Sequence, residues 1–144
     1  MSLAIIDARE WQNRFDLETG QPLDDSHPVV SMVSRVLRRN PYPGDVDEKA
    51  NQWVSQTALD LIHDYAPDLV CLSYVQQFFA ARHSALTPEA LDDLCVNAMA
   101  EAMHFIAASG YTPVIIGTGG LMPLKGEMDL SMLDGLAVSA NWSA

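Results

Sequence analysis

The sequence is poor in basic residues and in cysteine. It holds 8 lysine and arginine residues against 19 aspartate and glutamate residues, a formal net charge of −11. Because such a charge repels the phosphates of nucleic acids and the anionic headgroups of membranes, we expect neither as a partner. The two cysteines, Cys71 and Cys95, lie in apolar patterns, and the first residues do not resemble a signal peptide. We therefore expect buried, reduced thiols in a cytoplasmic protein.

Uninterrupted apolar runs of membrane-spanning length are also missing. Residues 105–124 carry no charge, but glycine and proline residues interrupt this stretch repeatedly, so a buried strand between loops fits it better than a membrane helix. With 49% apolar and 19% charged residues, the 144 residues fit a single globular domain. Predicted strands lie close to both ends, which suggests a piece of a longer polypeptide.

Apolar periodicity predicts helices that alternate with strands. The expected strands are residues 3–6, 68–74, 113–116 and 136–138, and the expected helices are residues 26–39, 45–65 and 87–109. Residues 69–72 are apolar without alternation, as in a strand covered on both faces. Long helices between buried strands form βαβ units. The sequence therefore predicts an α/β fold, a three-layer α/β/α arrangement around a mainly parallel sheet.

The ends of the predicted strands place the candidate site. In open parallel sheets, ligands bind outside the carboxyl ends of the strands. Four segments would meet there: Asp7, the residues from Ser73 to His83, the loop Gly117-Thr118-Gly119-Gly120, and Ser139-Ala140.

From Pro67 to Gly135, the order of strand, Arg82-His83 loop, long helix, strand and glycine-rich loop resembles the second half of the metal-dependent phosphodiesterase/alkaline phosphatase superfamily. The likeness covers about residues 50–135 and implies an alkaline-phosphatase-like core. It implies that Asp7 stands where the superfamily has a metal-binding aspartate. His83 matches the histidine of its Asp-x-x-Gly-His motif.

Other ligand positions of the superfamily are altered. Phe79 stands where that motif has its aspartate, and Thr118 and Gly119 replace the Asp-His pair after the later strand. A two-metal site needs several carboxylates and imidazoles to hold ions about 4 Å apart, and only Asp7 and His83 remain as vestigial metal ligands. We therefore predict no cofactor and no metal-dependent hydrolysis by this chain alone. The expected function is that of a catalytically degenerate domain, a binding, regulatory or structural module.

The loop of Gly117, Thr118, Gly119 and Gly120 has a second interpretation. Glycines at a strand end can turn successive backbone N–H groups toward an anion, and Thr118 would add a hydroxyl. The loop could then bind a small anionic ligand. The alternative is a plain tight turn.

Two further classes of function stay open. Ser73 at a strand end is the candidate nucleophile of a metal-independent small-molecule hydrolase, although no Gly-x-Ser-x-Gly elbow surrounds it. The strand-end segments at 67–73 and 112–120 also look similar to those of flavodoxin-like or cobalamin-binding-like modules. The partners left open are a second copy in a homo-oligomer and the remainder of a longer chain.

Overall fold

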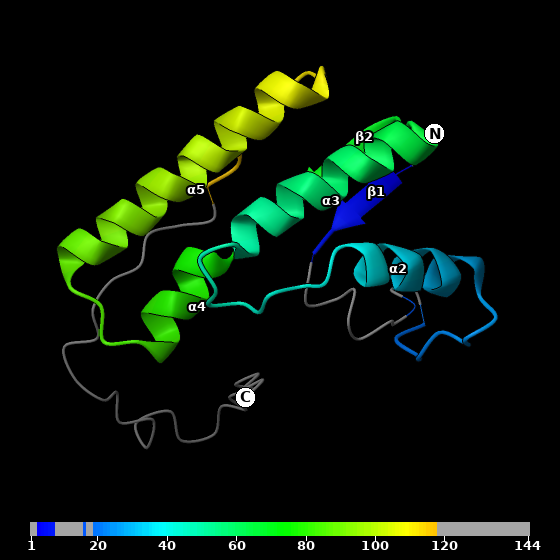
Figure 1. The fold of residues 1–144 in the computed structure, drawn as a ribbon, viewed down its shortest axis with the longest axis horizontal. Helices are drawn as coiled ribbons and strands as arrows, with labels where there is room; N and C mark the ends of the chain where they lie inside the picture. Colours follow the sequence, from blue (N-terminus) through cyan, green and yellow to red (C-terminus); the bar gives the residue numbers. More distant parts are fainter. Residues whose placement is uncertain (1–2, 8–15, 17–18, 118–144) are drawn as a thin grey trace, which may run out of the picture.

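A computed structural model of the chain describes residues 3–7, 16 and 19–117 (Figure 1). Helices and strands are mixed, and β1 pairs with β2 in parallel, Leu3 opposite Leu69 and Ile6 opposite Leu72. This confirms an α/β character with parallel pairing. The elements are β1 (Leu3–Ile6), α2 (Pro28–Arg39), α3 (Ala50–Tyr65), β2 (Leu69–Leu72), α4 (Gln76–His83) and α5 (Pro88–Ser109).

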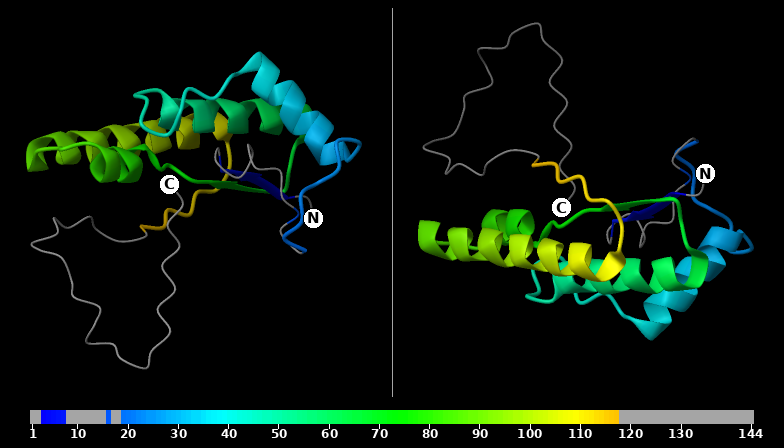
Figure 2. Two further views of the ribbon diagram at one scale, coloured as in Figure 1. Left: turned by 90° about the horizontal axis from the view of Figure 1, so that it is seen from below. Right: turned by 90° about the horizontal axis from the view of Figure 1, so that it is seen from above.

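The described helices lie on one side of the two strands (Figure 2). The residue pattern of β2 agrees, because Leu69 and Cys71 are exposed while Val70 and Leu72 are partly buried. The prediction of a strand covered on both faces is therefore wrong for the described part of the chain. Apolar residues on both faces of a strand show that both could be covered, not that both are.

The cysteines are free, as expected, but the expectation that they are buried is wrong. Cys71 and Cys95 are both exposed. Cys71 lies on the face of β2 that no described helix covers, and Cys95 lies on α5 without being covered by α3 or α4. An apolar sequence context identifies a face that can be buried, whereas burial requires a packing partner.

Helix α2 follows the sequence prediction. The His27 side chain accepts a hydrogen bond from the Val29 N–H at 3.3 Å, and Pro28 occupies the first turn. Arg38 and Arg39 lie in the last turn, where their positive charges interact favourably with the negative end of the helix dipole. Its buried residues are Val30, Val33 and Val36, which follow one another at helical spacing.

Helix α3 is the most deeply buried element and carries most of the core. The cluster of buried residues comprises Ile6 of β1, Val36 of α2, and Trp53, Val54, Ala58 and Leu61 of α3. Tyr42 packs edge-on against Trp53, with ring centroids 4.9 Å apart. The core therefore sits where β1, α2 and α3 meet.

The predicted start of this helix at Asp45 is wrong, because α3 begins at Ala50. The preceding residues form turns, in which the Asp47 N–H donates to the Gly44 carbonyl and the Lys49 N–H donates to the Asp47 side chain. Aspartate side chains compete with the helix for backbone N–H groups in this way. Val46, predicted on the apolar stripe, is 54% exposed as a result.

The expected Arg82-His83 loop is also corrected, since both residues form the last turn of α4. The Asn51 side chain accepts from the Gln76 N–H at 3.3 Å at the start of this helix. The partner lies 25 residues away along the chain, so local sequence did not reveal the start.

Helix α5 begins and ends as predicted. The Thr87 hydroxyl accepts from the Ala90 N–H at 3.2 Å, Pro88 opens the helix, and Gly110 takes the left-handed conformation after it, with φ 71°. No described helix has both the length and the apolar character needed to cross a membrane.

The predicted strand at 113–116 does not form. The segment lies outside helices and strands, and Val114, Ile115 and Ile116 are 83%, 57% and 79% exposed. Just before it, the Tyr111 hydroxyl donates to the Pro67 carbonyl near the start of β2. A β-ladder needs a neighbouring edge in register, and within residues 3–7, 16 and 19–117 the sheet holds only β1 and β2.

Candidate functional site

The candidate site is the edge of the sheet at which both strands end. Because β1 and β2 are parallel and in register, Asp7 and Ser73 leave the sheet side by side. The Ser73 N–H donates to the carbonyl of Ile6, the residue before Asp7, at 3.2 Å. The structure therefore brings together two candidates that lie 66 positions apart (73 − 7) in the sequence.

A pair of hydroxyl groups lies next to this edge. Tyr74 follows β2, and Ser55 belongs to α3. Their hydroxyl oxygens are 2.8 Å apart and form a hydrogen bond. Burial raises the pKa of the Tyr74 phenol, the bond to Ser55 opposes that shift, and the charge of Glu101 adds to it. Tyr74 is thus a neutral hydroxyl at ordinary pH, held in place by a buried partner.

A cluster of amide side chains joins α3 to α4 beside that pair. The Asn51 amide group donates to the side chains of Gln76 and Gln77 at 3.4 and 3.3 Å, and Gln77 donates to the Tyr74 carbonyl at 2.8 Å. Asn51 and Gln76 are buried. Within the described part of the chain, no buried side-chain nitrogen or oxygen lacks a partner. These amides therefore bond to each other and hold α4 in place.

Carboxylates surround Tyr42 on the β1 side of the edge. The Tyr42 hydroxyl donates to Asp45 at 2.7 Å. Burial is the main cause that raises the pKa of this phenol well above its usual range. The hydrogen bond to Asp45 and the negative charges of Asp45, Asp7 and Asp47 raise the pKa further. The negative field that acts on Tyr42 would also act on a bound anion, so this part of the edge disfavours one.

His83 packs against a residue of its own helix, α4. Its ring stacks on Phe79, with centroids 6.2 Å apart and planes inclined by 9°. Phe79, at the position of an aspartate in the superfamily, thus packs against the histidine. Across residues 3–7, 16 and 19–117, no three histidine, cysteine, aspartate or glutamate side chains gather in a group that could hold a metal ion.

The glycine-rich loop is only partly placed. Gly117 is exposed and ends the described residues, and among those residues nothing beyond its chain neighbours lies within 4 Å of an added Cβ. Thr118, Gly119 and Gly120 lie outside the described residues, as do Ser139-Ala140, the matching segment 121–135 and the predicted strand at 136–138. Most of the predicted anion-binding loop therefore lies outside the described residues.

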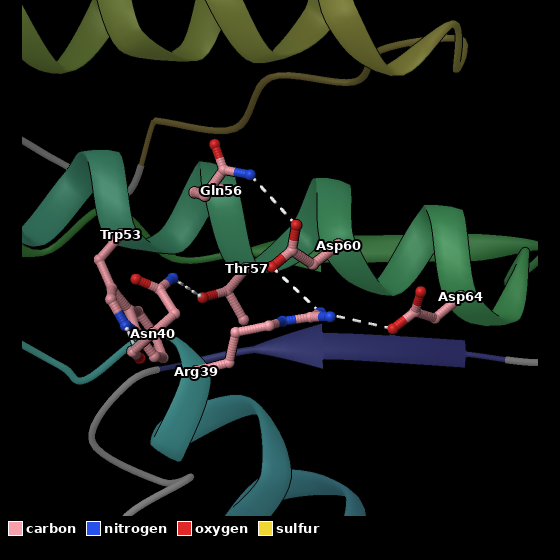
Figure 3. A network of polar contacts seen from close by, with 7 residues as sticks. All are labelled: Arg39, Asn40, Trp53, Gln56, Thr57, Asp60 and Asp64. Carbon is pink, nitrogen blue, oxygen red and sulfur yellow. Dashed lines mark hydrogen bonds and ion pairs between the residues drawn. The ribbon is translucent and has the colours of Figure 1, made fainter.

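A second polar network fastens α2 to α3 beside β1 (Figure 3). Arg39 contacts Asp60 and Asp64 at 3.2 and 3.4 Å. The Asn40 amide donates to the Thr57 hydroxyl at 3.1 Å, and the Asn40 carbonyl accepts from the Trp53 indole at 2.7 Å. Thr57 is fully buried. This network positions the core, and we assign it no ligand.

Sequence reasoning found Asp7 and Ser73 but missed Tyr42, Asn51, Ser55 and Tyr74. The missed residues lie on α3 or in connecting segments, and they approach the edge only when α3 packs across the two strands. A polar residue inside an apolar helical pattern, such as Ser55 between Val54 and Ala58, is the signal that could have identified them.

Comparison of the chain with protein families, with curated proteins and with solved structures finds no match. The likeness to the phosphodiesterase/alkaline phosphatase superfamily therefore rests on the sequence motifs alone.

Proposed function

We propose that this chain is a binding, regulatory or structural module of alkaline-phosphatase-like ancestry that does not carry out two-metal hydrolysis by itself. Its ligand site would lie at the carboxyl edge of β1 and β2. The full three-layer arrangement, with helices also on the other face of the sheet, belongs to this proposal.

One observation carries the proposal: the edge next to Asp7 is built from hydroxyl and amide groups that bond to each other. Ser55 bonds to Tyr74, Asn51 bonds to Gln76 and Gln77, and His83 stacks on Phe79. A two-metal phosphoryl site needs carboxylates and imidazoles directed at shared ions. Here the hydroxyl and amide groups instead satisfy one another and fix the packing of α3 against α4 and the end of β2.

An anionic ligand would bind farther along the edge. The carboxylates of Asp7, Asp45 and Asp47 disfavour an anion beside Tyr42. The predicted position for such a ligand is the loop from Gly117 to Gly120, where backbone N–H groups and the Thr118 hydroxyl would be the donors.

Calorimetric titration with Zn²⁺ and Mg²⁺, together with hydrolysis of bis-p-nitrophenyl phosphate, tests the proposal. We expect no binding of two ions per chain and no turnover above that of buffer. Titration with inorganic phosphate tests for anion binding at the loop from Gly117 to Gly120. Thr118→Val should weaken any such binding.

The control variant is Asp7→Asn, which keeps the shape of the side chain and removes its charge. Under the proposal it leaves both the metal titration and the hydrolysis assay unchanged. Binding of two ions with turnover, both abolished by Asp7→Asn and by His83→Gln, would show that the metal site is intact and would overturn the proposal.

A further inference from the structure

Among the residues that the structure describes, helix α5 is covered on one side only. It packs against α3 and α4, and it runs alongside α3 in Figure 1. Ala98 is the residue of α5 that is buried, and Phe105 reaches the core cluster from the same helix. The inner side of α5 is therefore already occupied by helix packing.

Apolar side chains also line the opposite side. Val96, Met99 and Met103 are 66%, 50% and 53% exposed. Their spacing of three and four residues places them on one face of the helix. Isolated exposed apolar residues are ordinary, but a row of three large ones along a helix resembles an interface.

The same face becomes acidic toward the start of the helix. Asp92 lies four residues before Val96, with Asp93 beside it, and both are exposed. The helix holds four acidic residues, Glu89, Asp92, Asp93 and Glu101, and neither lysine nor arginine. The outer face of α5 thus joins an apolar stripe to a negatively charged end.

We propose that this outer face, formed by Asp92, Asp93, Val96, Met99 and Met103, is a docking surface for a basic amphipathic helix of a protein partner. The apolar side of that helix would cover the two methionines and Val96, and its lysine or arginine side chains would reach Asp92 and Asp93. Methionine side chains adapt to differently shaped apolar partners, which suits such a surface. Opposite charges would steer the approach and fix the orientation.

The charge of the chain favours this occupant over two others. A second copy would bring another formal charge of −11. Residues 118–144 of the same chain carry one basic residue, Lys125, against three acidic ones, Glu127, Asp129 and Asp134. Both would add negative charge beside Asp92 and Asp93, whereas a basic helix neutralises it.

The inference goes beyond the proposed function and does not depend on it. The strand edge with Asp7 and the outer face of α5 involve different residues, so each can fail alone. Loss of peptide binding says nothing about metal binding, and the reverse also holds.

Fluorescence anisotropy with a labelled helical peptide of leucine and lysine, the leucines on one face, tests the proposal. A peptide with the same leucine face and glutamate in place of lysine is the matched probe. We expect the lysine peptide to bind, the glutamate peptide to bind at least about tenfold more weakly, and added salt to weaken the first.

Two pairs of variants distinguish binding at the outer face of α5 from a general attraction of the basic peptide to an acidic protein. Met99→Gln with Met103→Gln should weaken binding of the lysine peptide about tenfold, while Ala108→Gln, an exposed change on another side of α5, should leave it unchanged. Asp92→Asn with Asp93→Asn should weaken binding about threefold at low salt, and the equal charge change Asp24→Asn with Asp25→Asn should have a smaller effect. Circular dichroism confirms that each variant keeps its helix content.

Three outcomes would overturn the proposal. The first is unchanged binding in the methionine variant with normal helix content. The second is equal binding of the two peptides. The third is a dimer in sedimentation velocity that the methionine variant dissociates, because a second copy would then occupy the face.

Discussion

Two regions of this molecule are equally rich in apolar residues but differ in burial. Where β1, α2 and α3 meet, the residues of the core cluster are nearly inaccessible, with Ile6, Val54 and Trp53 at 0%, 1% and 4% exposure. Along α5 and the segment that follows it, residues of the same kind are exposed, from Met99 at 50% to Val114 at 83%. Apolar composition therefore does not tell which part of this chain forms its core.

The contrast arises from how many sides of each element have a partner. Helix α3 contacts β1, β2 and α5, so several of its sides are covered. Helix α5 contacts α3 and α4 and is apolar on more sides than these two helices can cover. The exposed side chains of Val96, Met99 and Met103 therefore mark α5 as the helix whose apolar surface is incompletely covered in the described residues.

The largest expected effect comes from truncating the centre of the first region. Trp53→Ala removes a side chain that is 4% exposed, its edge contact with Tyr42 and its hydrogen bond to the Asn40 carbonyl. We expect it to lower the free energy of unfolding by about 3–5 kcal/mol. Urea titration followed by circular dichroism measures the change.

Met103→Ala is the matched truncation in the second region. Its side chain is 53% exposed, so we expect a change within about 0.5 kcal/mol. Equal losses from Trp53→Ala and Met103→Ala would show that α5 is enclosed in solution, and the contrast between the regions would disappear.

The amide cluster predicts an intermediate effect. Asn51→Ala leaves Gln76 buried without its partner and removes the side chain that accepts from the Gln76 N–H. We expect a loss of about 1–3 kcal/mol, because an unsatisfied buried polar group costs its full desolvation penalty. Chemical denaturation measures the loss, and hydrogen exchange of α4 amides should increase. Gln52→Ala, an exposed neighbour, is the control, and an equal loss there would contradict the role of the cluster.

Tyr42 predicts a smaller, pH-dependent effect. Its folded pKa lies above the unfolded value of about 10, since burial and the nearby carboxylates disfavour the phenolate. The stabilisation is fully present below pH about 10 and is lost as the pH rises toward the folded pKa, because the unfolded state then loses its proton first. Unfolding free energies should therefore fall above pH about 10. The pKa of Tyr74 is also raised, so Tyr74 contributes part of this alkaline decline in stability.

Tyr42→Phe isolates the contribution of this hydroxyl. It keeps the ring against Trp53, removes the bond to Asp45, and should cost about 1 kcal/mol at neutral pH. The alkaline decline should then be less steep than in the unchanged chain. An identical alkaline profile in both proteins would rule out Tyr42 as its source.

The smallest effect is expected at the surface contact between α2 and α3. The Arg39 side chain is 55% exposed, and the side chains of Asp60 and Asp64 are 26% and 38% exposed. Arg39→Gln should lower stability by less than about 1 kcal/mol, and added salt should reduce the difference further. A larger, salt-independent loss would mean that Arg39 acts through packing of its aliphatic stem.

The helix ends show what local sequence predicts well. His27-Pro28 and Thr87-Pro88 mark the starts of α2 and α5, and Gly110 marks the end of α5, because each signal acts within one turn of the helix. The start of α4 was missed because its capping group, Asn51, comes from α3. The strand at 113–116 was predicted from its apolar run, but a strand also requires a partner.

The candidate site shows the same division. The sequence placed Asp7 and Ser73 at strand ends, and parallel pairing brings them to one edge. Their neighbours Tyr42, Ser55 and Tyr74 could not be assigned from local patterns, since α3 must first pack across the strands. The resemblance to the phosphodiesterase/alkaline phosphatase superfamily stays a prediction.

The sequence by itself determined the acidic character of the chain, the helix signals and the positions of the apolar faces, since these depend on composition and on neighbours a few residues away. Tertiary structure alone decided which apolar faces are covered and which polar residues gather at the strand ends. Burial and side-chain contact are relations between segments distant in the chain, so an isolated element cannot contain them.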